Sequence, residues 1–268
     1  SMLRLAALLI ACLFVLQPAA FAQDKRPFTV HDLVQLKRLS EPALSPDGRT
    51  VVFTLRETDL EANRGRTDLW ALDIATKGAM PRRLTSHPAN DSSPQWSSDG
   101  RYIYFLSTRS GSSQVWRLNL GGGEAEQVTN LPLDVGSFKL APNDATLAFT
   151  VEVFPDCEDF ACTRARLENK KQSKQTGMTH DRLFVRHWDT WADGRVSKLF
   201  AYTLRNGRID GEAIALSGSL DADVPSKPFG GADEYTFSPD GSRVVFSTKL
   251  KGSAEAWSTN FDFYEVSI

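Results

Sequence analysis

The clearest pattern in the chain is a tight turn followed by a strand of alternating apolar positions. A Ser-Pro-Asp-Gly turn or a close variant opens residues 44–53, 96–105 and 237–246, and a worn copy lies at 140–149. In such a turn serine accepts hydrogen bonds, proline fixes φ, aspartate bonds backbone N–H groups and glycine takes the left-handed position. The β-branched and aromatic residues that follow favour strands. The pattern predicts four repeats of one β unit.

A second predicted strand with an aromatic residue follows each turn. These strands lie at 68–72, 114–118, 198–202 and 255–258, and closing strands follow the first three, ending at 84–85, 128–129 and 216–217. Repeats of about 40–50 residues with four short strands are typical of propeller blades. Four tryptophans recur at blade-equivalent positions, which favours core packing: Trp70, Trp96, Trp116 and Trp257.

The third unit is longer than the others. The aromatic residue of its second strand, Phe200, follows the turn residue Asn143 by 57 residues, whereas Trp116 follows Asp99 by only 17. We therefore expect one blade with about 40 extra residues, because long loops on a rigid scaffold interrupt a repeat without ending it.

These strands predict an all-β fold, a partial β-propeller of about four four-stranded blades with one long insertion. We place the blades at about 44–90, 91–132, 133–220 with the insertion near 154–192, and 232–268, the last incomplete. A segment at 23–43 precedes them. It contains a short amphipathic helix from Asp32 to Leu39, which Thr29 can cap.

The first residues have the pattern of a secretory signal peptide. Arg4 precedes twelve apolar residues at 5–16, and the small-residue site at 20–22 predicts cleavage after residue 22. The apolar run is well short of the roughly 20 residues that a membrane-spanning helix needs. The four residues ending at Cys12 also resemble a lipoprotein box, so a lipid on Cys12 stays open. Either way, we expect a periplasmic or secreted protein.

Export affects the interpretation of the two remaining cysteines, Cys157 and Cys162. An even pair in an oxidising compartment favours a disulfide that pins a loop over two free thiols. A zinc site would need two further ligands, and none is close in sequence. Their spacing also differs from that of a redox Cys-x-x-Cys motif.

Composition and motifs narrow the function classes. The chain has 31 Lys+Arg against 33 Asp+Glu, and a net charge of −2 lacks the basic footprint of a nucleic-acid binder. The sequence has no Gly-rich phosphate loop and no metal-ligand cluster, so we expect no cofactor and no metal. It also has no Gly-x-Ser-x-Gly nucleophile elbow, and its four histidines have no credible triad partners.

The repeats resemble those of TolB-type propellers. Together with the segments at 29–33 and 37–40, they are similar to the N-terminal propeller of prolyl oligopeptidase family serine peptidases. The Arg-His-Trp-Asp-Thr-Trp segment at 186–191 resembles the dipeptidyl peptidase V and acylaminoacyl-peptidase branch. The resemblance implies an α/β-hydrolase domain with a Ser-Asp-His triad downstream. It also implies a parent enzyme that removes dipeptides or acylated residues from peptide N-termini, while the propeller gates and positions the peptide.

The insertion is the best candidate for substrate binding. Its basic first part, 163–182, is interpreted as a solvated, mobile arm. Its second part combines charge with aromatic surface in Arg186, His187, Trp188, Asp189 and Trp191. Asp189 could hold the α-ammonium of a peptide and Arg186 a peptide carbonyl, while Trp188 or Trp191 walls a side-chain pocket.

Alternatives to this site stay open. The tryptophans could instead pack the blade while Arg186 and Asp189 pair with each other. Glu152, Glu158 and Asp159 are alternative donors of the negative charge. No residue of the chain is assigned a catalytic role, so the fragment alone should be inactive.

Partners follow from the same resemblance. We expect a peptide substrate with a free N-terminus, the hydrolase domain of the same chain and no nucleic acid, and a homodimer stays open. Removing the signal leaves 246 residues, which hold about four blades where family propellers have seven or eight, so we expect a fragment. Two other hypotheses are a non-catalytic periplasmic TolB-type propeller that binds proteins, and a propeller for another ligand such as a glycan or lactone.

Overall fold

The computed structural model describes residues 26–180, 186–252 and 255–268. The predicted signal peptide, Cys12 and a few residues of the insertion lie outside the described residues. The chain divides into two units, residues 1–36 and 37–268, which are described separately. Within the described part of the chain, no helix combines the length and apolar character needed to cross a membrane.

The first unit contains the helix α2 (Val30–Gln35). Thr29 caps it, and its backbone N–H donates in return to the Asp32 carboxylate at 2.8 Å, which forms a capping box. The predicted cap is confirmed, but the predicted helix bounds are wrong. Leu36 already has an extended ψ of 123°, and Leu39 lies in the strand that follows.

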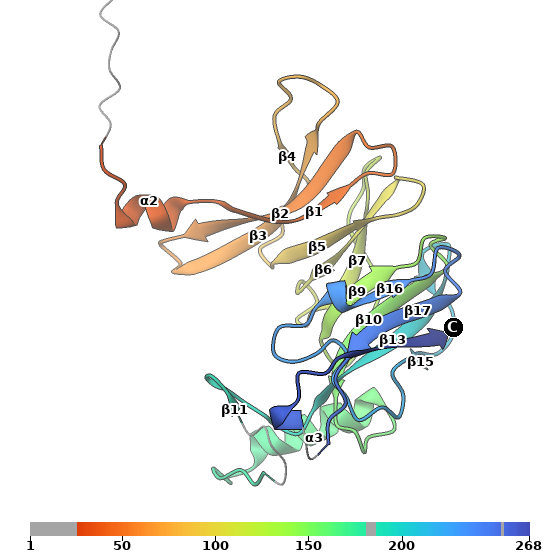
Figure 1. Cartoon of the computed structure of the whole chain (residues 1–268). Coiled ribbons are helices and arrows are strands. Elements are labelled where there is room, and N and C mark those ends of the chain that lie inside the picture. The colour runs from red at the N-terminus through yellow and green to blue at the C-terminus, as the bar shows by residue number, and fades with distance from the viewer. Residues whose placement is uncertain (1–25, 181–185, 253–254) are drawn as a thin grey trace, which may run out of the picture. The chain divides into compact units, whose positions relative to one another are not determined.

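The second unit consists of antiparallel sheets, which follow one another along the chain as blades 1 to 4 (Figure 1). Blade 1 contains β1 (Arg38–Leu44), β2 (Thr50–Asp59), β3 (Arg64–Asp73) and β4 (Arg82–Arg83), and blade 2 contains β5 (Asp91–Trp96), β6 (Tyr102–Ser107), β7 (Gln114–Asn119) and β8 (Glu126–Gln127). Blade 3 contains β9 (Val135–Leu140), β10 (Thr146–Val153), β13 (Val196–Arg205), β14 (Arg208–Ile209) and β15 (Ile214–Ala215). Blade 4 contains β16 (Tyr235–Phe237), β17 (Arg243–Thr248) and β18 (Asp262–Ser267). The predicted all-β partial propeller is confirmed.

The predicted turn chemistry is present in the structure. In blade 2 the Ser97 hydroxyl donates to Asp99 at 2.6 Å and accepts from the Tyr102 N–H at 2.9 Å. The serine hydroxyl and then the Arg101 backbone lower the pKa of Asp99 to about 2. Gly100 follows with a φ of 70°, the left-handed position that glycine adopts without a Cβ clash.

The worn turn of blade 3 differs in an informative way. Asp144 takes the glycine position with a φ of 57°, and its carboxylate reaches blade 2. There the Ser98 N–H donates to its two oxygens at 3.0 and 2.9 Å, and the Ser98 hydroxyl donates at 2.6 Å. Ser98 occupies the position that proline holds in the other turns, and proline has no N–H. Serine in place of proline thus supplies the N–H that binds the aspartate found in place of glycine, so the two departures from the repeat form one contact between blades 2 and 3.

Aromatic residues face each other across the central strands of every blade. The register pairs Phe53 with Trp70, Phe105 with Trp116, Phe149 with Phe200 and Phe246 with Tyr264. In blade 4 the second strand is thus β18, and the prediction of a strand at 255–258 is wrong. Those residues form the 3-10 helix η2 (Glu255–Trp257), which the Lys249 ammonium closes by donating to the Glu255 and Ser258 carbonyls.

The tryptophans do not all pack in the core as predicted. Trp96 and Trp116 pack against the core between blades 1 and 2, and the Trp96 indole N–H donates to the Ala43 carbonyl at 2.9 Å. Trp257, in contrast, is 83% exposed. The prediction is wrong for Trp257, because η2 lies outside the sheet register.

Successive blades enclose apolar cores. Ile103 and Phe105 of β6 face blade 1, whereas Tyr104 and Leu106 of the same strand face blade 3. A strand that is covered on both faces needs apolar residues at consecutive positions. A third core joins blades 3 and 4, with Leu199 on one side and Phe246 on the other.

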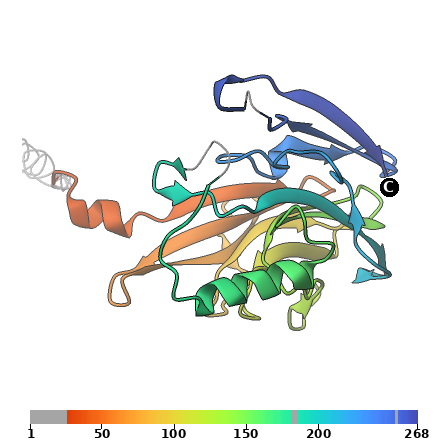
Figure 2. The ribbon, with the colours of Figure 1, turned by 90° about the horizontal axis from the view of Figure 1, so that it is seen from below.

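The insertion leaves blade 3 between β10 and β13. It contains the helix α3 (Phe160–Gln172) and the short strands β11 (Arg186–His187) and β12 (Thr190–Trp191). Figures 1 and 2 show α3 across the same end of blade 3 from which the insertion emerges. The described basic side chains of the insertion's first part, 163–182, are exposed, as expected for a solvated segment. The helix is nevertheless anchored to the blade, since Thr163 is fully buried and its hydroxyl accepts from the Phe154 N–H at 3.1 Å.

Candidate functional site

The predicted binding residues lie on one short hairpin. β11 and β12 pair with Arg186 opposite Trp191 and His187 opposite Thr190, which leaves Trp188 and Asp189 as the loop between them. Successive side chains of a strand point to opposite faces. The hairpin therefore has two faces, one with Arg186 and Trp191 and the other with His187.

The first face carries a cation over an aromatic ring. The Arg186 guanidinium lies 5.3 Å from the centre of the Trp191 ring, and His180 stacks on the same ring at 6.0 Å. Arg186 makes this contact instead of an ion pair with Asp189, so the alternative of an Arg186–Asp189 pair is wrong. The N–H groups of a guanidinium held over a ring are oriented and can donate to a ligand.

The second face meets the link between blades 3 and 4, which carries Phe229. The ring centre of Phe229 lies 5.7 Å from that of His187 and 5.3 Å from that of Trp188. Trp188 is nevertheless 74% exposed, and Trp191 is also exposed. The alternative in which both tryptophans pack the blade is wrong.

Phe229 is not among the residues predicted from the sequence. It lies in the loop 225–231, which follows a fully buried Val224 and precedes the 3-10 helix η1 (Ala232–Glu234). The only signal in the sequence is a large aromatic residue between prolines and Gly-Gly in a polar link. Gly230 is required where the loop closes, because a Cβ there would lie 2.4 Å from the Ser226 carbonyl oxygen.

A cavity of about 750 Å³ opens beside this loop. Its walls come from α3, from the ends of β9, β10 and β13, and from the loop 225–231. The lining includes Ser112, Asp134, Ser137, Thr150, Glu152, Arg164, Glu168, Lys171, Arg195, Lys227, Pro228 and Gly230. This volume is in the range of small-ligand sites, and hydroxyl and backbone groups on the walls can bind a peptide backbone.

Ion pairs neutralise most of the charge on the cavity walls. Glu152 accepts from Lys227 at 2.6 Å and from Arg195 at 3.2 Å. Asp159, another predicted anchor, caps α3 by accepting from the Cys162 N–H at 2.7 Å. Of the three alternative donors of negative charge, Glu152 and Asp159 are therefore engaged within the chain.

Several contacts hold α3 as a wall of the cavity. Cys157 and Cys162 form a disulfide at its N-terminus, and Arg166 forms two 2.8 Å bonds with Asp156. Leu167 packs against the core between blades 2 and 3. Arg164, Glu168 and Lys171 follow at helical spacing and line the cavity.

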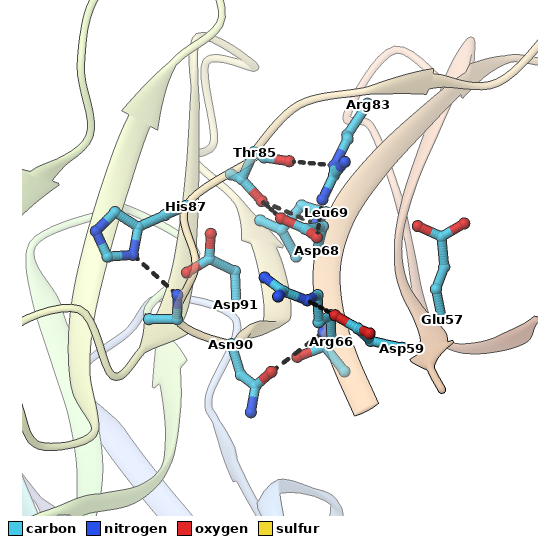
Figure 3. Close-up of polar contacts among 12 residues, drawn as sticks. Glu57, Asp59, Arg66, Asp68, Leu69, Arg83, Thr85, His87, Asn90 and Asp91 are labelled. Carbon is cyan, nitrogen blue, oxygen red and sulfur yellow. Dashed lines mark hydrogen bonds and ion pairs between the residues drawn. The ribbon is translucent and has the colours of Figure 1, made fainter. Parts of the chain in front are cut away.

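A second polar cluster lies between blades 1 and 2. Figure 3 shows the carboxylates of Asp68 and Asp91 beside each other, with Arg83 on Asp68. Arg109 binds Asp91 at 2.6 Å. Burial raises the pKa of Asp68, and the bond from Arg83 opposes that rise. Because both carboxylates are almost fully buried, the cluster joins the two blades and is not an open site.

The described residues include no group of three or more His, Cys, Asp and Glu side chains that could hold a metal ion.

The repeats, turns and blades match a known family. Residues 33–181 match the family described as the TolB beta propeller domain, which is more than half of the chain. The chain belongs to this family. The TolB-type propeller also has curated relatives over almost its whole length. It is 27% identical over 257 residues to dipeptidyl-peptidase 5 of Porphyromonas gingivalis and 28% identical over 265 residues to dipeptidyl-peptidase 5 of Aspergillus fumigatus.

Each of these matches covers 92% of this propeller chain but only 35% of the relative. The chain thus spans about a third of the length of the curated relatives it matches. Among solved structures, acylaminoacyl peptidase of Pyrococcus horikoshii aligns with a TM-score of 0.58 at 14% identity, over 88% of this chain and 32% of that one. This likeness shows the fold. The resemblance to the propellers of the dipeptidyl peptidase 5 and acylaminoacyl peptidase group is confirmed.

Proposed function

We propose that this TolB-type propeller is the N-terminal part of an exported serine peptidase that removes dipeptides or acylated residues from peptide N-termini. The observation that carries the proposal is the similarity of almost the whole chain to one third of relatives named dipeptidyl-peptidase 5. In this proposal a hydrolase domain of the same protein cleaves the peptide, and the propeller gates and positions it.

The hairpin β11–β12 supplies the contacts in this proposal. Asp189 lies at the exposed tip and binds the α-ammonium of the peptide. Arg186, oriented by the Trp191 ring, donates to a peptide carbonyl. The cavity beside loop 225–231 accommodates part of the peptide, since its walls combine hydroxyl groups with backbone N–H and C=O groups.

Export to the periplasm is part of the proposal. It is supported by the apolar N-terminal run with its small-residue cleavage site. The disulfide at α3 is consistent with it, because disulfides persist in oxidising compartments. Mass spectrometry of the mature protein, purified from the periplasm of the cells that produce it, should find Gln23 as the first residue. A lipid on Cys12 would contradict this cleavage.

The test of the proposed activity uses the protein made from the complete coding region. We expect it to release dipeptides from chromogenic dipeptidyl amides, and a serine-directed reagent should abolish the release. An N-acetylated version of the same substrate separates dipeptidyl from acylaminoacyl specificity. A protein that binds other proteins but cleaves neither substrate would contradict the proposal and favour a non-catalytic TolB-type propeller.

A further inference from the structure

We infer that Trp188 and Phe229 form an aromatic platform that binds a large apolar side chain of the peptide, and that the Lys227–Glu152 ion pair positions it. This inference rests on the proposed function and deepens it. It names the class of side chain selected, an additional binding residue, Phe229, and two positioning residues.

Both rings are exposed in the described part of the chain. Trp188 is 74% exposed and Phe229 is 73% exposed, although their ring centres lie only 5.3 Å apart. The two rings contact each other but belong to none of the apolar cores of the described blades. Exposed apolar surface of this kind is typical of sites where a partner is bound.

The backbone of Trp188 is strained. Trp188 has a φ of 49°, in the left-handed region where a residue with a Cβ is disfavoured. Glycine is the usual residue at such a position in a short hairpin loop. A bulky residue held in this conformation points to a functional requirement for its side chain.

The geometry of the rings suggests what they bind. The two rings meet edge to face, with their planes at 61°, and both keep most of their surface exposed. Aromatic rings pair through offset-stacked or edge-to-face contacts, so an aromatic side chain of a peptide can make such a contact with the exposed surface of either ring. His187 contacts both rings from within the hairpin, at 5.1 Å from Trp188 and 5.7 Å from Phe229.

Phe229 of the platform lies between two residues that line the cavity. Pro228 and Gly230, on either side of Phe229, both line the cavity of about 750 Å³. A peptide that places one side chain on the platform can therefore continue along loop 225–231 into the cavity. Peptides are the occupant to which we commit, because the relatives that match this chain are named peptidases.

Two ion pairs and a capping contact fix the loop that carries Phe229. Lys227, two residues earlier, binds Glu152 of β10 at 2.6 Å, and Arg195 holds the same carboxylate at 3.2 Å. At the other side, the Ser226 N–H and hydroxyl both donate to Glu234 at 2.7 Å. Lys227 lies in the loop and Glu152 binds it, so both act on the Phe229 ring only through the loop and are positioning residues.

The test compares peptides that differ in one side chain. The full-length protein is titrated with two series of N-terminally free peptides in which phenylalanine or serine occupies the first or the second position. We expect tighter binding of the phenylalanine peptide at one of these positions. Phe229→Ala should reduce that preference about three- to tenfold, the value of one aromatic contact, while binding of the serine peptide stays within twofold.

Two further variants make the result specific. Trp188→Gly, which suits the left-handed backbone, should reduce the preference as Phe229→Ala does. Met80→Ala is the control at another exposed apolar side chain, because Met80 is 81% exposed in the link between β3 and β4 and should leave the preference unchanged. The thermal unfolding temperature of each variant should match that of the parent protein. If Phe229→Ala does not fold, Phe229→Ser takes its place in the comparison.

The positioning role has its own readout. Lys227→Met should reduce the preference for phenylalanine, Lys227→Arg should restore it, and combining Lys227→Met with Phe229→Ala should add little. A wild-type protein that binds peptides with no preference for phenylalanine, or a Phe229→Ala variant with an unchanged preference, overturns the platform and leaves the proposed function standing. A protein that neither binds nor cleaves any of the peptides overturns both.

Discussion

The contact between Ser98 of blade 2 and Asp144 of blade 3 leads to a sharp prediction about stability. The variants Ser98→Pro and Asp144→Gly each restore the residue found at the same place in the other turns. Proline fits this turn position in blades 1 and 4, as Pro46 and Pro239, so Ser98→Pro should not disturb the backbone. What it removes is the N–H and hydroxyl that donate to Asp144 at 2.6–3.0 Å.

The size of the effect follows from the bonds that are lost. Hydrogen bonds to a charged acceptor contribute about 1.5–3 kcal/mol, and solvent at this exposed site reduces the pair to about 1–2 kcal/mol in total. Ser98→Pro alone should therefore destabilise the propeller by about 1 kcal/mol. In the Asp144→Gly background the donor has no acceptor to lose, and proline should stabilise by about 0.4–1 kcal/mol through the unfolded chain. The effect of one substitution thus changes sign.

Urea unfolding of the mature protein, followed by tryptophan fluorescence, measures all four corners of this double-mutant cycle. Ser98→Ala is the matched control, because it keeps the backbone N–H and should lose only part of the coupling. If Ser98→Pro changes the free energy of unfolding equally in both backgrounds, within about 0.5 kcal/mol, the two residues are not coupled and the reasoning is refuted.

Three other predictions concern single residues. Asp99→Ala should lower stability with little effect on peptide affinity. The folded pKa of Asp99, about 2, lies below the ordinary value near 4, so the stability that Asp99 contributes should be present above pH 4 and be lost between about pH 4 and 2. Acid unfolding of an Asp99→Asn variant should lack this pH-dependent loss. A selective loss of affinity in a folded Asp99→Ala variant would contradict a structural role. Gly230→Ala should disturb the loop 225–231 and weaken peptide binding several-fold, because the new Cβ would lie 2.4 Å from a backbone atom of the loop. Gly177→Ala is the control, since a Cβ there would have nothing within 4 Å. Equal peptide binding by the two variants would contradict the role given to Gly230. Trp257→Ala should change the free energy of unfolding by less than about 0.5 kcal/mol, whereas Trp116→Ala should lower it by about 3 kcal/mol or more in the same urea unfolding experiment. Similar losses for the two variants would show that Trp257 packs in the core.

The blades were predictable because their signals are local. In the turns of blades 1, 2 and 4, serine bonds to both aspartate and glycine within three residues, so the turn and the start of its strand can be identified without knowing the fold. The aromatic positions of blades 1 to 3 were predicted from the local strand pattern, although they follow their turns at different distances, 23, 17 and 57 residues after Asp47, Asp99 and Asn143. The prediction of a strand at 255–258 failed. The sequence around Trp257 resembles that around Trp70 and Trp116, but these residues form a 3-10 turn that Lys249 closes by binding its carbonyls.

The insertion shows the opposite case. Nothing local made residues 160–172 a clear helix, since the segment is polar on most sides and Thr163 is its one buried position. Its helix is held by contacts with Phe154, Asp156 and the blade core, which are visible only once the chain is folded. Phe229 likewise gained a role only when the loop 225–231 was placed against the hairpin.

The repeat, the turn chemistry, the all-β class and the resemblance to peptidase propellers can all be predicted from the amino-acid sequence alone, because each depends on residues that are neighbours in the chain or on family patterns. The tertiary structure decided which strand completes blade 4, that α3 is a wall of a cavity, and that Trp188 of the insertion meets Phe229 from a loop about 40 residues later. Such contacts bring together distant segments, and their free energy comes from burial and ion pairs that form only in the assembled blades. For that reason the candidate site could be located in the sequence only in part.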